Sequence, residues 1–499
     1  MVINMKYIST RDARANPEKI SSAEAIKRGL APDGGLYLPE TIPTTDMDFI
    51  RSLAGLSYSD AAAKILSLFL DDYNYDELRE DCRSAYGAAF GDDPAPVKKA
   101  GDNVWCLELW HGPTCAFKDM ALQLMPRLLS RALAMTGEKR TALVLVATSG
   151  DTGKAALEGY KNVPGVAIKV FYPVDGVSRV QKLQMMTQDG SNVDVCAIRG
   201  NFDDAQSGVK RIFSDAAMRD ELDIRGYFLS SANSINWGRL VPQIVYYYTG
   251  YVKLAMSGTI AWGNVIDVAV PTGNFGNIFA AYMASRMGLP IRRLICASNS
   301  NNILTDFLST GVYDRNRAFH TTMSPSMDIL ISSNLERLIY LMTDAATTAS
   351  LMGQLSQNGR YELPDEVLKK IRGKFVGYYA DENATSAAIK RHFDKYGYLC
   401  DTHTAVALSC VDADMSSGAA DAVPVLVAST ASPYKFAGDV FASLTGKNPP
   451  DGPAALCELA ELTGTNIPAP LDGLERRKII FDRVCDVNDM ANDVLEQLK

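Results

Sequence analysis

The stretch TALVLVATSGDTGKAA, residues 141–156, joins an apolar segment to a polar turn and then to a helical pattern. Residues 141–147 are almost all apolar and do not alternate with polar ones, which is typical of a strand buried on both faces of a parallel sheet. Ligands of open α/β sheets bind beyond the carboxyl ends of such strands. The stretch therefore predicts an α/β fold with a ligand site just after residue 147.

Similar apolar runs recur along the chain and predict further buried strands at 166–172, 193–198, 265–270, 293–298 and 423–429. Helical patterns separate these runs, so we expect mainly parallel sheets covered by helices. A chain of 499 residues is too long for one ordinary core. The first 95 residues combine a turn-rich piece with helical patterns, and residues 335–400 are mostly helical in pattern, as in an insertion or a separate lobe.

The composition argues against several classes of protein. A formal net charge of −8 without a basic stripe does not suit a nucleic-acid-binding protein, and no apolar run is long enough to span a bilayer. The first residues show no secretory signal. The 9 cysteines are scattered and the 4 histidines are far apart, which predicts free thiols in the cytoplasm and no metal site.

The turn ATSGDTG, residues 147–153, offers hydroxyl groups and backbone N–H groups at the start of a helix. Such a helix start binds anions readily. The turn resembles a P-loop, but Thr148 replaces a required glycine and Ala155 replaces the magnesium ligand. Taken alone, the motif fits an ordinary turn capped by Asp or Thr equally well.

A second turn, PTGNFGN at residues 271–277, also follows an apolar strand. Its glycines and asparagines permit left-handed backbone angles, so that successive N–H groups can surround a phosphate. An ordinary strand-to-helix turn is again the alternative, but two such turns in one chain favour an anionic ligand. In SSANSINWGRLVPQ, residues 230–243, Arg239 can bind a phosphate or carboxylate with two hydrogen bonds, although a surface arginine is the more common case.

One lysine stands out in HGPTCAFKDMALQ, residues 111–123. Lys118 follows apolar residues at a helix start, and a desolvated lysine has a lowered pKa and forms Schiff bases. Most lysines are surface residues, so this stretch alone is weak evidence for a catalytic lysine.

In STASPYKF, residues 429–436, Ser429 and Thr430 place neutral hydroxyls at a strand end, while we expect Lys435 to be solvated. His111 receives no role.

Together these stretches resemble the threonine synthases, pyridoxal-phosphate enzymes of the tryptophan-synthase-β-like fold. The motifs occur in the family's order and span nearly the whole chain, and the length is similar to that of the longer bacterial and fungal branch. The segments that carry the resemblance are GLAPDGGLYLPE (29–40), HGPTCAFKDMALQ (111–123), ATSGDTGKAAL (147–157), ANSINWGR (232–239), PTGNFGNIFAAYMA (271–284), SPSMDILISSNLER (324–337), DTHTAVAL (401–408) and STASPYKF (429–436).

The resemblance implies two mainly parallel-sheet α/β domains with pyridoxal 5'-phosphate in the cleft between them. A smaller mobile domain would comprise residues 119–250, and a larger one residues 96–118 and 251–499. Residues 1–95 would be an N-terminal threonine-synthase region and 335–400 a helical insertion.

The resemblance also implies a role for individual residues. Lys118 would carry the cofactor as a Schiff base and then move protons between substrate carbons. Asp151 would lie beside the 3′ oxygen of the cofactor and Thr430 would bind its pyridine nitrogen. The other implied contacts are Gly273, Asn274, Phe275, Gly276 and Asn277 to the cofactor phosphate, Thr148, Ser149 and Thr152 to the substrate carboxylate, and Asn233, Ser234 and Arg239 to the substrate phosphate.

The reaction implied is the conversion of O-phospho-L-homoserine and water to L-threonine and phosphate, by γ-elimination and β-hydration in a monomer or homodimer. Many enzymes of this fold have Asn where Asp151 stands, and a carboxylate repels a phenolate unless a proton is shared, so the protonation state there is open. Pro126 removes a backbone donor and predicts a kink in the helix after Lys118.

Three alternatives remain at this point. A lyase of the same fold, such as threonine dehydratase or an O-acylserine sulfhydrylase, does not need a second phosphate site. A non-catalytic threonine-synthase-like protein would lack one of the site residues. A nucleotide-dependent kinase would need an intact P-loop and a magnesium ligand.

Overall fold

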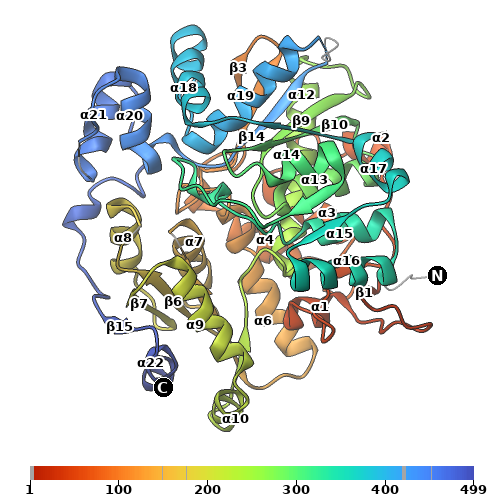
Figure 1. Cartoon of the computed structure of the whole chain (residues 1–499), viewed down its shortest axis with the longest axis vertical. Coiled ribbons are helices and arrows are strands. Elements are labelled where there is room, and N and C mark those ends of the chain that lie inside the picture. Colours follow the sequence, from red (N-terminus) through yellow and green to blue (C-terminus); the bar gives the residue numbers. More distant parts are fainter. Residues whose placement is uncertain (1–4, 149, 176, 419–422, 451, 499) are drawn as a thin grey trace.

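Two separate, mainly parallel sheets form the framework of the chain (Figure 1), as the sequence predicted. The computed structural model describes residues 5–148, 150–175, 177–418, 423–450 and 452–498. The larger sheet has 6 strands in the order β13-β10-β9-β14-β4-β3, and only β3 runs antiparallel to its neighbour. Its strands are β3 (Val97–Gly101), β4 (Val104–Glu108), β9 (Ile266–Pro271), β10 (Ile291–Ser298), β13 (Phe375–Tyr379) and β14 (Val425–Ser429).

The smaller sheet is parallel throughout and has 5 strands in the order β15-β7-β6-β5-β8. Its strands are β5 (Thr141–Ala147), β6 (Val166–Pro173), β7 (Val193–Arg199), β8 (Tyr227–Ser230) and β15 (Val484–Asp486). Strand β5 is the apolar segment quoted first, and no residue of it is exposed. Two short antiparallel pairs complete the strands: β1 (Tyr7–Ser9) with β2 (Tyr37–Pro39), and β11 (Val312–Asp314) with β12 (Arg360–Glu362).

Helices cover both sheets and build the N-terminal region, and no helix in the described ranges is long and apolar enough to cross a membrane. The N-terminal helices are α1 (Ser22–Arg28), α2 (Met47–Arg51), α3 (Tyr58–Leu66) and α4 (Tyr75–Ala85). The helices between Lys118 and strand β8 are α5 (Asp119–Leu122), α6 (Met125–Met135), α7 (Asp151–Tyr160), α8 (Arg179–Met186), α9 (Phe202–Ser214) and α10 (Ala216–Ile224).

The remaining helices belong mainly to the larger part of the molecule. They are α11 (Trp237–Leu240), α12 (Pro242–Met256), α13 (Gly276–Met287), α14 (Ile303–Thr310), α15 (Leu335–Met342), α16 (Ala345–Asn358), α17 (Asp365–Arg372), α18 (Glu382–Tyr396), α19 (Thr402–Ser416), α20 (Ala437–Thr445), α21 (Pro453–Thr463) and α22 (Met490–Gln497). Short 3-10 turns lie at η1 (Ala88–Phe90), η2 (Pro325–Met327), η3 (Pro433–Phe436) and η4 (Leu474–Arg476).

Two segments depart from the expected domain organisation. Residues 335–400 are mostly helical, but they also supply β13, which pairs with β10 at the edge of the larger sheet. The C-terminal strand β15 pairs with β7 instead of remaining with the larger part of the chain. With only 3 residues, β15 is too short for its pattern to be recognised in the sequence.

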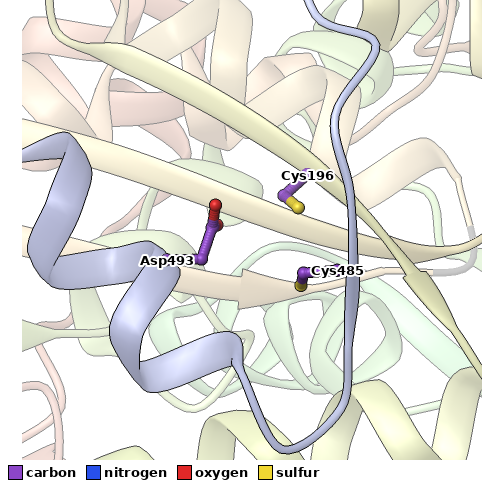
Figure 2. Close-up of side chains that lie close together, drawn as sticks. All are labelled: Cys196, Cys485 and Asp493. Atoms are coloured by element: carbon purple, nitrogen blue, oxygen red, sulfur yellow. The ribbon is translucent and has the colours of Figure 1, made fainter.

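An ion-pair network holds the C-terminus to the smaller sheet. Cys196 of β7, Cys485 of β15 and Asp493 of α22 lie together (Figure 2), with their ligand atoms within 4.8 Å of one another. Lys169 Nζ already lies 2.5 Å from Asp493 Oδ2, and Arg483 Nη2 lies 2.6 Å from Asp194 Oδ1. These two cations would repel a metal ion. We therefore interpret the cluster as the contact that attaches β15 and α22 to the smaller sheet.

The N-terminal region packs directly onto the short helix α11. The ring of Trp237 lies 5.5 Å from that of Tyr7 and 5.6 Å from that of Phe69. Asn236, which caps α11, donates from Nδ2 to Ile26 O at 2.9 Å. Because Arg239 lies on this helix, the N-terminal region fixes the place of a predicted site residue.

The helix after Lys118 is broken, in keeping with the kink predicted from Pro126. Helix α5 ends at Leu122 and α6 begins at Met125, with the proline in its first turn. The break leaves Leu122 O facing α7, where a Cβ built on Gly159 would lie 1.8 Å from that oxygen. Only glycine permits α7 to approach this closely.

We therefore expect Gly159→Ala to lower the free energy of unfolding by about 1–3 kcal/mol, since the methyl group forces the two helices apart. Gly353 of α16 has no atom within 4 Å of its Cβ position, and Gly353→Ala should raise stability by about 0.5–1 kcal/mol through helix propensity. Urea denaturation followed by circular dichroism measures both. Equal effects of the two substitutions would contradict the close contact.

Candidate active site

Lys118 lies in the interior and not on the surface. It caps the start of α5, and only 8% of the residue is exposed. Its Nζ donates to Ser326 Oγ at 3.1 Å and to Asp151 Oδ2 at 3.4 Å. Burial lowers the pKa of the Lys118 amine; the negative charge of Asp151 opposes this effect, while the positive charges of Lys435 and Arg239 add to it. A buried amine with a lowered pKa suits nucleophilic and base chemistry.

Asp151 is the first residue of α7 and lies between two lysines. Its Oδ1 accepts from Gln181 Nε2 at 2.8 Å and lies 2.7 Å from Lys435 Nζ, while Oδ2 faces Lys118. Burial raises the pKa of this carboxyl, but the charges of Lys435 and Lys118 and the hydrogen bonds hold it well below the usual range. Asp151 is therefore an ionised acceptor.

Lys435 departs from expectation, since the sequence suggested a solvated side chain. Only 3% of the residue is exposed, and its Nζ also donates to Thr114 O at 3.0 Å. The segment STASPYKF turns into η3 directly after β14, and this turn directs the lysine inward. A buried lysine needs an anionic partner, and Asp151 supplies it.

The loop PTGNFGN forms a tight cradle at the end of β9. Phe275 has a φ of 63°, in the left-handed region, and α13 begins directly after it without a side-chain cap. Asn334 N and Nδ2 both donate to Asn274 O at 3.0 Å. A Cβ on Gly273 would lie 2.8 Å from Ser326 O, so this loop lies beside the serine that contacts Lys118. Free N–H groups at the start of a helix of this length bind a phosphate well.

Asn277 provides the clearest sign that a ligand belongs at this loop. Its Oδ1 accepts from Tyr246 OH at 2.8 Å and from Tyr247 OH, which fixes the orientation of the amide. Its Nδ2 is buried and has no hydrogen-bond partner among the described residues. Leaving a buried donor unpaired costs about 1–3 kcal/mol, and a phosphate oxygen would accept from it. The loop therefore fits the phosphate of the implied cofactor.

Ser429 and Thr430 place two hydroxyl groups at the end of β14, and that of Ser429 is engaged with its neighbours. Ser429 Oγ lies within hydrogen-bond distance of Trp110 Nε1 (3.0 Å), Thr404 Oγ1 (3.2 Å) and Tyr398 OH (3.3 Å). Thr430 is also buried, and its carbonyl oxygen accepts from Phe117 N at 2.8 Å, next to Lys118. The position of Thr430 beside the lysine and the engagement of Ser429 both favour Thr430 as the ligand of a pyridine nitrogen.

The first turn, ATSGDTG, is closed by its own threonine. Thr148 Oγ1 accepts from the backbone N–H groups of Gly150 and Gly153, both at 3.0 Å. Thr148 is buried and Thr152 half-buried in the first turn of α7, while Ser149 lies outside the described residues. A role of these hydroxyl groups in binding a substrate carboxylate stays a prediction, because Thr148 already serves the turn itself.

Arg239 is a buried cation without a matching anion. Its residue is 6% exposed, and Nη1 donates to Ala232 O at 2.5 Å. No acidic side chain in the described part of the chain forms a salt bridge with it, and burial lowers its pKa to about 10. Asn233 is exposed and Ser234 half-buried on the turn before it. The guanidinium is thus available to an anionic ligand.

Sequence reasoning missed two residues that support the lysine. Ser326 contacts Lys118 through its hydroxyl, and its backbone N–H donates to His403 Nε2 at 3.1 Å. His403 Nδ1 in turn lies 3.0 Å from Asp401 Oδ1, which fixes the ring. Both lie in quoted motifs, SPSMDIL and DTHTAVAL, but the contact joins segments 77 residues apart.

His111, to which the sequence assigned no role, lies 2.9 Å from Glu108 Oε2 and stacks on Trp110.

Two family models together match most of the chain. A family model described as the threonine synthase N terminus matches residues 6–86, and one described as pyridoxal-phosphate dependent enzyme matches residues 93–430. Threonine synthase of Pseudomonas aeruginosa is 38% identical over 463 residues, which cover 92% of this chain and 94% of that protein.

A solved structure and a longer relative complete the comparison. The pyridoxal-phosphate-bound threonine synthase of Brucella melitensis superposes with a TM-score of 0.87 at 38% identity, covering 99% of this chain and 98% of that one. Threonine synthase-like 1 of Macaca fascicularis is 40% identical over 456 residues, or 88% of this chain. The chain spans only 60% of the length of that relative.

The unpaired amide of Asn277 gives a prediction about ligand binding. Asn277→Asp keeps an acceptor for both tyrosines but replaces the free donor with a negative oxygen, so the affinity for pyridoxal phosphate should fall about 10–100-fold. Absorbance titration of the cofactor-free protein measures this affinity. Asn383→Asp, at an exposed position of α18, is the matched control and should bind normally. Unchanged binding by Asn277→Asp would show that this amide does not contact the cofactor.

Proposed function

We propose that this chain, which belongs to the threonine synthase family of pyridoxal-phosphate-dependent enzymes, converts O-phospho-L-homoserine and water to L-threonine and phosphate. The observation that carries the proposal is Arg239, a buried guanidinium without an acidic partner among the described residues. Its charge acts on Lys118, and it does not belong to the phosphate cradle formed by the loop at residues 273–277. A second anion site beside the working lysine suits a phosphorylated amino acid.

The cofactor would be held by groups that the fold brings around Lys118. Lys118 would bind it covalently, Asp151 would face its 3′ oxygen and Thr430 its pyridine nitrogen. Gly273, Asn274, Phe275, Gly276 and Asn277 would hold its phosphate, which the unpaired Asn277 Nδ2 supports. When bound, pyridoxal phosphate withdraws electrons from the amino acid attached to it and so acidifies the neighbouring C–H bonds.

Lys118 would act as the mobile base. Once released from the cofactor, the amine lies in the interior, where its lowered pKa leaves it free to accept a proton. Its four-carbon chain lets Nζ reach successive substrate carbons, so one group can carry the protons removed at Cα and Cβ, one at a time, and return one to Cγ and one to Cα. Ser326 Oγ, 3.1 Å from Nζ, would hold the amine between these positions.

The substrate would be bound at both of its charged ends. Thr148, Ser149 and Thr152 would receive its carboxylate at the start of α7. Asn233, Ser234 and Arg239 would bind the phosphate, with Arg239 supplying two parallel hydrogen bonds. The same residues would retain the phosphate after it leaves Cγ, and a charge held there neutralises the leaving group.

Control of water would depend on the two domains. In this proposal the part built on the smaller sheet, residues 119–250, closes over the substrate before water adds at Cβ. The C-terminal strand β15 would move with this part, because it pairs with β7. A cytoplasmic location and a monomeric or homodimeric state belong to the same proposal; the 9 unpaired cysteines support the location.

Removing the lysine tests the whole assignment. Lys118→Ala should abolish the cofactor's Schiff-base absorbance and lower threonine formation from O-phospho-L-homoserine by at least about 10³-fold, since the covalent attachment and the base are lost together. Threonine is quantified by chromatography. Lys154→Ala, at a buried lysine of α7 paired with Glu158, is the control and should retain the absorbance. Threonine formation by Lys118→Ala at the parent rate would contradict the proposal.

Arg239 separates this function from that of other lyases with the same cofactor. Arg239→Met should lower kcat/KM for O-phospho-L-homoserine about 30-fold or more, because the substrate phosphate then lacks its buried partner. The absorbance of the bound cofactor should not change. Arg219→Met, at an exposed position of α10, controls for the loss of one surface charge. If Arg239→Met turned over the phosphorylated substrate normally, the second phosphate site would have to lie elsewhere.

A further inference from the structure

Two buried lysines share one carboxylate at the centre of this site. Lys118 Nζ lies 3.4 Å from Asp151 Oδ2, and Lys435 Nζ lies 2.7 Å from Asp151 Oδ1. The side chain of Lys435 is 0% exposed, that of Lys118 9% and that of Asp151 4%. Burying charges is tolerated where they are paired, and one carboxylate can neutralise only one ammonium fully. One of the two amines therefore has a strong reason to lose its proton.

The contacts indicate which amine stays charged. Lys435 has the shorter distance to the carboxylate and a second acceptor in Thr114 O, 3.0 Å away. Lys118 has the longer contact, and its other partner, Ser326 Oγ, can donate to a neutral amine as well as accept from an ammonium. The geometry therefore favours a charged Lys435 and a neutral Lys118.

We propose that Lys435 is a positioning residue of the active site, which occupies the carboxylate of Asp151 and so leaves Lys118 as the free amine that attaches the cofactor and accepts protons. The inference rests on the proposed function only in taking Lys118 as the working amine. Lys435 itself touches no reacting atom in this account and acts through Asp151.

The other carboxylates around the two lysines have partners of their own. Asp119 accepts from Thr114 N at 2.8 Å and Oγ1 at 2.6 Å, and burial raises its pKa to about 6. Lys154 Nζ pairs with Glu158 Oε2 at 3.0 Å. The buried thiol of Cys115 has a raised pKa because of burial, and Arg239 adds a positive charge. Among the described residues, Asp151 is thus the carboxylate for which Lys118 and Lys435 compete.

The direction of the pKa shift agrees with this geometry. After burial, the pKa of Lys118 is governed by attraction to Asp151 and by repulsion from Lys435. Removing the charge of Lys435 removes the repulsion and frees the whole carboxylate for Lys118. Both changes stabilise the ammonium form of Lys118, so its pKa must rise.

The test measures Lys118 in the cofactor-free protein, without substrate. The rate of amine labelling with acetic anhydride is followed against pH, and the Lys118 peptide is quantified by mass spectrometry. Lys435→Met should raise the apparent pKa of Lys118 by about one unit or more. Lys169→Met is the matched control, because Lys169 is equally buried and paired with Asp194 and Asp493 but lies on β6; its replacement should leave Lys118 unchanged.

Further variants keep the test decisive. Lys435→Gln retains a donor to Thr114 O and replaces Lys435→Met if the latter does not fold. Lys435→Arg keeps the charge and should keep most of the low pKa. When Asp151 is already Asn, Lys435→Met should raise the pKa of Lys118 by less than it does in the parent, because no carboxylate is released; a merely structural role of Lys435 would not produce this dependence on Asp151.

The inference is wrong if Lys435→Met and Lys435→Gln leave the labelling pKa of Lys118 at the value found for Lys169→Met. A protein with the expected shift that forms no threonine would refute the proposed function but not this inference. A protein that forms threonine without the shift would refute this inference but not the proposed function.

Discussion

The buried carboxylate of Asp151 is the interaction on which the site depends. It joins the start of α7 to Lys118 ahead of α5 and to Lys435 of η3, and these cations, with a hydrogen bond from Gln181, hold its own pKa far below the usual range. Breaking a buried pair of this kind costs about 3–5 kcal/mol. The two sheets must therefore place their strand ends opposite each other, since α7 follows β5 of the smaller sheet and η3 follows β14 of the larger one.

The charges at the site leave an excess of positive charge for ligands. With Lys118 neutral, the two cations Lys435 and Arg239 are accompanied by one ionised carboxylate, Asp151, which pairs with Lys435. Arg239 lacks an acidic partner in the described ranges, and Asn277 Nδ2 lacks any partner there. A substrate phosphate would satisfy Arg239 and a cofactor phosphate would satisfy Asn277. The N-terminal region contributes indirectly, because Trp237 and Asn236 fix α11 against it.

The sequence predicted what depends on local patterns and failed where distant segments meet. The apolar run at 141–147 became β5 and the break at Pro126 separates α5 from α6, because burial on both faces and a missing donor act locally. The prediction that Lys435 is solvated was wrong, because its partner Asp151 follows a strand of the other sheet. Ser326 and His403 were missed, since their role arises only when η2 meets α19. Strand β15 is too short and too exposed to show a pattern.

The pairing also makes an aspartate at position 151 acceptable. With Asn there, the ammonium of Lys435 would be buried without an anion, at a cost that a neutral amide cannot offset. With Asp and no Lys435, the carboxylate would pair fully with Lys118 and hold it as an ammonium. Asp151 and Lys435 are therefore interdependent: each makes the other acceptable, and in the proposed function together they would leave Lys118 as a free amine.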